Sequence, residues 1–82
     1  MKLLVSVQVP AISQKYDILV PDDLRIKSVI TLIAGAVEGL SDHRYVASGE
    51  ECLCSNEKSI LLRHNATLKQ YGIQNGDHLI MM

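Results

Sequence analysis

Two runs within the first twenty positions place apolar residues at every second position, a pattern that is typical of strands with one buried face. The first run carries its apolar side on three valines, Val5, Val7 and Val9. Pro10 has no backbone N–H to donate and is predicted to end this strand. The second run, 14–20, places three apolar residues on one side, Tyr16, Ile18 and Val20. Two strands joined by so short a link are expected to pair as an antiparallel hairpin.

The period then changes to the spacing of three and four residues that is typical of an amphipathic helix. Its apolar stripe consists of Ile26, Val29, Ile30, Ile33, Ala34 and Val37. We expect Asp22 and Asp23 to cap the helix N-terminus, because an aspartate accepts the free amide hydrogens of a first turn. Gly39 is placed where the helix is expected to end. Further apolar residues lie off the stripe and could widen it, namely Leu32, Ala36 and Leu40.

The pattern after the helix is less regular. Residues 44–47 are predicted to form a short third strand, and Ser48 to Glu51 a turn. Residues 52–54 either pair with 59–63 in a hairpin whose tip is 55–58, or form a loop, and the sequence leaves both alternatives open.

The last fifteen residues combine tight turns with one more strand. Residues 67–73 predict a single helical or 3₁₀ turn closed by Gly72. Asn75–Asp77 predicts a turn in which Gly76 adopts positive φ, and 78–82 predicts the final strand. The whole chain, 1–82, is therefore expected to be one α+β domain with a mixed sheet of about five strands and one helix packed across one face.

Length and composition support this simple organisation. A chain of 82 residues buries one core, and without Phe or Trp that core must be aliphatic. Eight basic and nine acidic residues give a net charge of −1 with no basic run, so no nucleic-acid partner is expected. No secretory signal and no stretch of ~18 apolar residues is visible, so we expect a cytoplasmic protein without direct membrane insertion.

Few residues suggest chemistry. Cys52 and Cys54 are expected to point to opposite faces of an extended segment, which disfavours a disulfide between them and suits a reducing compartment. Together with His43 and His64 they match no usual zinc spacing. His78 has no nucleophile partner, and no Gly-rich phosphate loop occurs. We therefore expect no catalytic residues, no metal and no cofactor.

The closing segment Leu68-x-x-Tyr71-Gly72-Ile73-x-x-Gly76-Asp77-x-Leu79 resembles the ubiquitin superfamily, and the order of elements extends this likeness over essentially the whole chain. Within that superfamily the chain is similar to the YukD/EsaB proteins, small cytosolic components of bacterial type VII (WXG100 or Esx) secretion systems. The resemblance implies a ubiquitin-like β-grasp fold and an accessory or regulatory binding role. It also implies that the Tyr71 hydroxyl bonds to backbone near residues 62–64.

Ubiquitin-type modifiers and sulfur carriers react through a flexible tail that ends in Gly-Gly. This sequence ends in Met81-Met82 and contains no Gly-Gly pair. We therefore expect a non-catalytic protein-binding module that is not conjugated to other proteins.

Strand alternation also predicts a binding surface. With Leu79 and Met81 directed to the core, Ile80 and Met82 face the open side of the sheet, where we expect Leu4 and Val46 to join them. In ubiquitin-like proteins this face is the commonest docking surface, so the predicted partners are other proteins, in particular components or regulators of a type VII secretion system. The alternatives are a scaffold or self-associating domain, including a homodimer, unrelated to secretion, and a thiol- or metal-responsive protein acting through Cys52 and Cys54.

Overall fold

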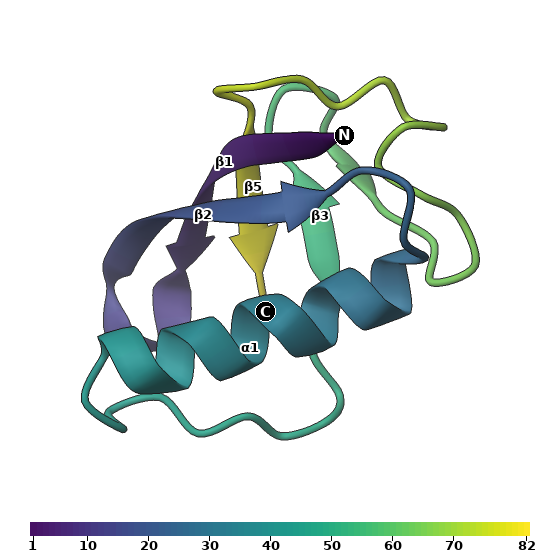
Figure 1. The fold of residues 1–82 in the computed structure, drawn as a ribbon. Coiled ribbons are helices and arrows are strands. Elements are labelled where there is room, and N and C mark those ends of the chain that lie inside the picture. Colours follow the sequence, from purple (N-terminus) through teal and green to yellow (C-terminus); the bar gives the residue numbers. More distant parts are fainter.

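Five strands form one mixed sheet in the order β2-β1-β5-β3-β4, and one helix crosses one of its faces (Figure 1). A computed structural model describes all residues from Met1 to Met82. The elements are β1 (Lys2–Val9), the 3₁₀ helix η1 (Pro10–Ile12), β2 (Gln14–Pro21), α1 (Ile26–Leu40), β3 (Leu53–Ser55), β4 (Ile60–Leu61) and β5 (His78–Met81). Strand β1 runs antiparallel to β2 and parallel to β5, while β3 is antiparallel to both β4 and β5. The predicted α+β architecture is confirmed.

The first two strands form the predicted hairpin. Their register runs from Lys2 opposite Pro21 to Val9 opposite Gln14, and Pro10 begins the short helix η1 that joins them. Ser13 has a φ of 53°, which lets the chain reverse before β2 begins.

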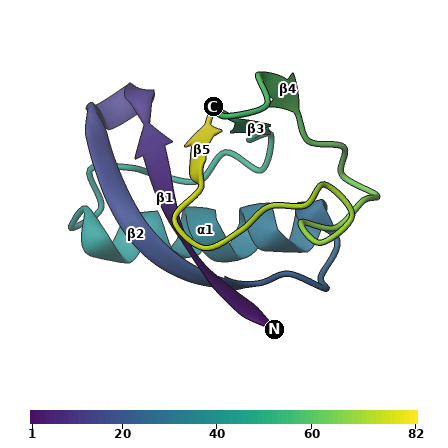
Figure 2. The same ribbon diagram turned by 90° about the horizontal axis from the view of Figure 1, so that it is seen from above.

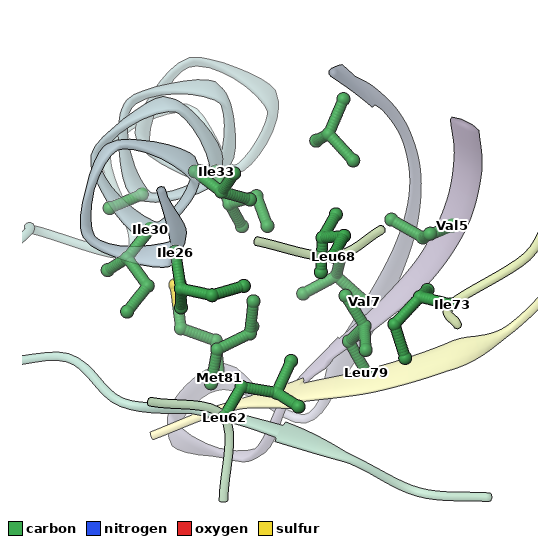
Figure 3. Packing of buried hydrophobic residues seen from close by; sticks show 14 of the residues in the cluster. Val5, Val7, Ile26, Ile30, Ile33, Leu62, Leu68, Ile73, Leu79 and Met81 are labelled. Carbon is green, nitrogen blue, oxygen red and sulfur yellow. The ribbon is translucent and has the colours of Figure 1, made fainter. Parts of the chain in front are cut away.

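The core lies between α1 and the sheet (Figures 2 and 3). All six stripe residues of the helix are buried, and they pack with inward-facing residues of β1, β3 and β5. Leu32 and Leu40 are 49% and 61% exposed, so neither of them widens the buried stripe. The spacing of three and four residues therefore marked the buried face of α1, and the leucines off that spacing remain at the surface.

The predicted cap of α1 is wrong. The helix begins at Ile26 after Arg25, which makes no side-chain cap hydrogen bond. The first two amide groups instead donate to backbone carbonyls of a distant segment, Ile26 to Ala66 at 2.7 Å and Lys27 to His64 at 3.2 Å. Asp22 accepts a hydrogen bond from the Met1 amino group at 3.1 Å rather than from the helix. The helix N-terminus is thus capped by tertiary structure.

The helix also ends later than predicted. Gly39 lies within α1, which continues to Leu40. Two residues beyond the helix adopt the left-handed conformation, Asp42, with a φ of 54°, and His43, with a φ of 63°. The His43 N–H donates to the Glu38 carbonyl at 2.9 Å, which satisfies one of the free carbonyls of the last turn.

The predicted third strand at 44–47 is also wrong, because these residues belong to a loop that runs from α1 to β3 along the side of the helix (Figure 1). Local hydrogen bonds compete with strand pairing here. The Tyr45 N–H donates to Ser41 Oγ at 3.1 Å, and its hydroxyl donates to Glu51 at 2.6 Å. The third strand is instead Leu53–Ser55, which pairs with Ile60–Leu61, so the hairpin alternative holds.

The closing segment forms the predicted turns. Gly72 and Gly76 have φ values of 69° and 85°, and Leu68 is fully buried. The Tyr71 hydroxyl accepts a hydrogen bond from the Arg63 N–H at 3.0 Å, within the backbone range expected from the resemblance.

The Tyr71 hydroxyl gives a direct stability prediction. Tyr71→Phe should lower the free energy of unfolding by about 1 kcal/mol, because the Arg63 N–H loses its acceptor while the ring keeps its packing. Urea denaturation monitored by circular dichroism measures the change. Tyr16→Phe is the matched control, since the Tyr16 hydroxyl makes no hydrogen bond and its ring also packs against the core. Equal losses in both variants would contradict the assigned role.

Candidate functional site

The open face of the sheet carries an apolar cluster over β5, β3 and β4. Ile80 lies between Gln8 of β1 and Cys54 of β3, and Cys54 lies opposite Leu61 of β4. Met82 follows β5, and its backbone exchanges hydrogen bonds of 2.6 and 2.9 Å with Cys52. Because side chains alternate along a strand, all of these point away from α1.

We call this cluster the Ile80 patch. Its members are Cys52, Cys54, Leu61, Ile80 and Met82. Leu61 and Met82 are 58% and 64% exposed, whereas Ile80 and both cysteines are half-buried. Its side chains are two thiols, two aliphatic groups and one thioether, so the patch presents an apolar surface that one exposed strand edge, β4, borders.

The four predicted surface residues do not form one group. Ile80 and Met82 lie together in the Ile80 patch. Leu4 is on the same face but lies opposite Leu19 at the other end of the strands, and the polar pair Ser6 and His78 separates it from Ile80. The open face therefore has two apolar areas with a polar row between them.

Val46 is not on this face, and its placement there is the error that follows from the wrong third strand. It is 71% exposed in the loop beside α1. A strand at 44–47 would have placed it next to β5, but that position belongs to β3.

The predicted directions of the two cysteines are wrong as well. Cys52 and Cys54 both flank the fully buried Leu53, so both lie on the open side. Residues two apart share a face because the side-chain period of a strand is two. They are free thiols, and their strand spacing of about 6.6 Å still disfavours a mutual disulfide, which requires Cβ atoms about 3.8 Å apart.

Sequence reasoning missed Leu61 and Leu19. Leu19 could have been found, because the alternation that directs Ile18 and Val20 inward directs Leu19 outward. Leu61 depended on whether 59–63 formed a hairpin, which the sequence left open.

A histidine–carboxylate contact lies on the open face in the polar row beside the Ile80 patch. Nδ1 of His78 lies 2.6 Å from the Glu57 carboxylate, and the His78 N–H also donates to that carboxylate. The hydrogen bond from the His78 side chain, followed by that from its backbone, holds the pKa of Glu57 below its ordinary value. Both side chains are exposed, and Ser6, which lies opposite His78, makes no hydrogen bond to it. The contact joins the β3–β4 turn to the start of β5.

A second cluster of polar groups lies in the loop beside α1. The buried Glu51 carboxylate accepts hydrogen bonds from the Tyr45 hydroxyl at 2.6 Å and from the amides of Ser48 and Gly49 at 2.7 and 3.1 Å. Burial by itself raises the pKa of Glu51, but these hydrogen bonds outweigh it and lower the pKa to about 2. Burial, with the hydrogen bond to Glu51, raises the pKa of Tyr45 to about 12.

This carboxylate has little capacity for chemistry. Both of its oxygens are engaged, so it shapes the loop that forms one wall of an open groove of about 400 Å³ against α1. Across the chain, no three His, Cys, Asp or Glu side chains come close enough together to hold a metal ion. No helix is both long enough and apolar enough to cross a membrane.

Comparison with known protein families matches residues 4–81 to the family described as "WXG100 protein secretion system (Wss), protein YukD". The chain belongs to the YukD family. No curated protein matches it. The YukD family model therefore connects this ubiquitin-like chain with WXG100 secretion over almost its whole length.

Solved structures agree on the fold. The ubiquitin-like domain of the type VII secretion system protein ECCD1 from Mycobacterium tuberculosis superposes with a TM-score of 0.79 at 13% identity, covering 100% of this chain and 98% of that one. The UBL domain of Plasmodium falciparum Dsk2 gives 0.72 at 18% identity, with full coverage of both chains. A ubiquitin-like domain from Arabidopsis thaliana gives 0.74 at 20% identity, covering 99% of this chain and 76% of that one. At these identities the likeness establishes the ubiquitin-like fold.

Proposed function

We propose that this chain is a non-catalytic, cytoplasmic protein-binding module that serves as an accessory or regulatory component of a WXG100 secretion system. The observation that carries the proposal is the match to the YukD family over residues 4–81, in a domain whose polar clusters are engaged in structural hydrogen bonds. A domain whose polar groups are engaged in this way supports protein binding rather than catalysis.

The Ile80 patch is the surface through which we propose that it binds. Its five side chains are neighbours on the sheet, and a docked partner would remove Leu61 and Met82 from water. Burying apolar area of this kind stabilises a complex by roughly 25 cal/mol per Å² before the costs of association. The partner of this patch is a WXG100 secretion-system protein that presents apolar side chains of its own.

A paired substitution tests this proposal. Leu61→Asp combined with Met82→Asp places two charges in the patch at exposed positions, so the fold should be retained. In the native cell, the variant should lose most secretion of WXG100 substrates and most co-purification of identified secretion components, because binding would then bury unpaired carboxylates.

Val46→Arg is the matched control, since it adds a charge at an equally exposed apolar position outside the patch. Cells that carry this variant should secrete WXG100 substrates as wild-type cells do. Circular dichroism and melting temperature confirm that both variants fold. Normal secretion and co-purification by the folded Leu61→Asp, Met82→Asp protein would refute the patch, and normal secretion in cells that lack the chain altogether would refute the functional proposal.

A further inference from the structure

Strand β2 forms a free edge of the sheet over eight residues, Gln14–Pro21 (Figure 2). Its only strand neighbour is β1, whereas β4 at the opposite edge has just two residues. An edge strand exposes a row of N–H and C=O groups that can pair with another strand. The β2 edge is therefore the longer of the two places where a further strand can add.

The hydrogen bonds of the hairpin fix which β2 groups are free. The Asp22 N–H donates to the Met1 carbonyl, and in an antiparallel ladder every second pair is bonded in this way. Tyr16 and Ile18 therefore direct their N–H and C=O toward β1. Those of Lys15, Asp17 and Leu19 point outward, and no other group in the structure takes them up.

An added strand can bond only to the backbone groups that point outward. Residues with outward-pointing N–H and C=O groups must therefore lie opposite residues of the same kind on the added strand. For a second β2 running antiparallel, registers centred on Lys15 or on Asp17 set like charges directly opposite each other. The register centred on Tyr16 sets Lys15 opposite Asp17 of the second copy, and Asp17 opposite its Lys15. Opposite charges stabilise such cross-strand pairs and like charges destabilise them.

The same register also suits the other side of the strand. It places Tyr16 opposite Tyr16 of the second copy in a non-hydrogen-bonded pair, where side chains come closest and aromatic pairs are favourable. Tyr16 is half-buried at the margin of the core, so its ring has surface left to cover. A lone lysine on an edge strand deters pairing, but the neighbouring Asp17 makes this edge complementary to itself.

We propose that a second copy of this chain docks on β2, antiparallel and centred on Tyr16, so that the two sheets join into one across a twofold axis. Lys15 and Asp17 then lie on one side of the joined sheet in both copies. The two Ile80 patches face that same side, which would present them together to a partner. The dimer does not depend on the proposed function.

Charge exchange tests the register. Sedimentation equilibrium over a concentration series to the millimolar range should show a monomer–dimer equilibrium for the wild type. Asp17→Lys and Lys15→Asp should each weaken dimerisation about tenfold or more, because two attractive pairs become two repulsive ones. Both side chains are exposed, so neither change should disturb the fold.

Mixing the two single variants should restore dimers, since every lysine of one chain then meets an aspartate of the other. The double exchange Lys15→Asp, Asp17→Lys should likewise dimerise as the wild type does. A wild type that remains monomeric over the whole series overturns the proposal. So do single variants that dimerise as tightly as the wild type, or a mixture that does not form heterodimers.

Discussion

Ile33→Ala should lower the free energy of unfolding by about 3 kcal/mol. Ile33 is fully buried at the centre of the α1 stripe, and its side chain projects into the cluster between helix and sheet (Figure 3). Truncation removes apolar contacts and leaves a cavity. The strands are hydrogen-bonded to one another, so the sheet can close this cavity only in part. Domains of this size have a total stability of roughly 4 to 12 kcal/mol, so the loss is a large fraction of it.

The neighbouring Leu32→Ala is the matched control, because Leu32 is on the same helix but about half exposed. It should change the free energy of unfolding by less than about 1 kcal/mol, since little apolar area is buried there and alanine favours the helix. Urea denaturation at neutral pH compares the two variants. Similar losses for both would contradict the arrangement in which the Ile26-to-Val37 stripe faces the sheet.

Elements that depend on local periodicity could be predicted from the sequence. The alternating valines of β1 and the stripe of α1 each record which side of one element is buried, and the structure confirms both. The motif around Tyr71 could be predicted for a similar reason, because Gly72 and Gly76 allow the backbone conformations that its turns require.

The errors occur where a contact that periodicity does not encode decides a local conformation. Asp22 is a good helix cap by its chemistry, but carbonyls of His64 and Ala66 reach the first amides of α1 and leave it no role there. Residues 44–47 have the composition of a strand, but the Glu51 carboxylate holds Tyr45 in a loop. The first contact joins segments about 40 residues apart, and the second depends on a side chain–side chain hydrogen bond that alternation does not reveal.

The candidate site divides in the same way. Ile80 and Met82 follow from the alternation of β5, which the sequence displays directly. Leu61 joins them only through the register between β3 and β4, and Val46 was assigned to the face through a strand that does not form. The free backbone groups of β2, by contrast, can be identified only from the hydrogen bonds of the structure. Alternation shows where side chains point but not which edge of the sheet is free.

Glu51→Gln should lower the free energy of unfolding at neutral pH by about 2 to 3 kcal/mol. The buried carboxylate accepts hydrogen bonds from three groups, and the amide of glutamine can replace only one of its two oxygens as an acceptor. Its NH₂ group would then face the N–H of either Ser48 or Gly49. The cost is that of a buried hydrogen bond to a charged group together with donors left unsatisfied.

The pH dependence gives the sharper measurement. The pKa of Glu51 falls from an ordinary value of 4.5 to about 2 on folding, which corresponds to about 3 kcal/mol. Because the folded state lowers this pKa, the stabilisation is complete above about pH 4.5 and is lost as the pH falls toward 2. The difference in stability between wild type and Glu51→Gln should therefore shrink over that interval.

Glu50→Gln is the control, since the neighbouring Glu50 side chain is exposed and makes no hydrogen bond through its carboxylate. Its stability should parallel that of the wild type at every pH.

At the alkaline end, the raised pKa of Tyr45, about 12, predicts that the hydrogen bond from Tyr45 to Glu51 persists through pH 10 and weakens only as the pH approaches 12. If the free energies of unfolding of wild type and Glu51→Gln differed by a constant amount from pH 2 to 4.5, the Glu51 carboxylate would not be what holds this loop.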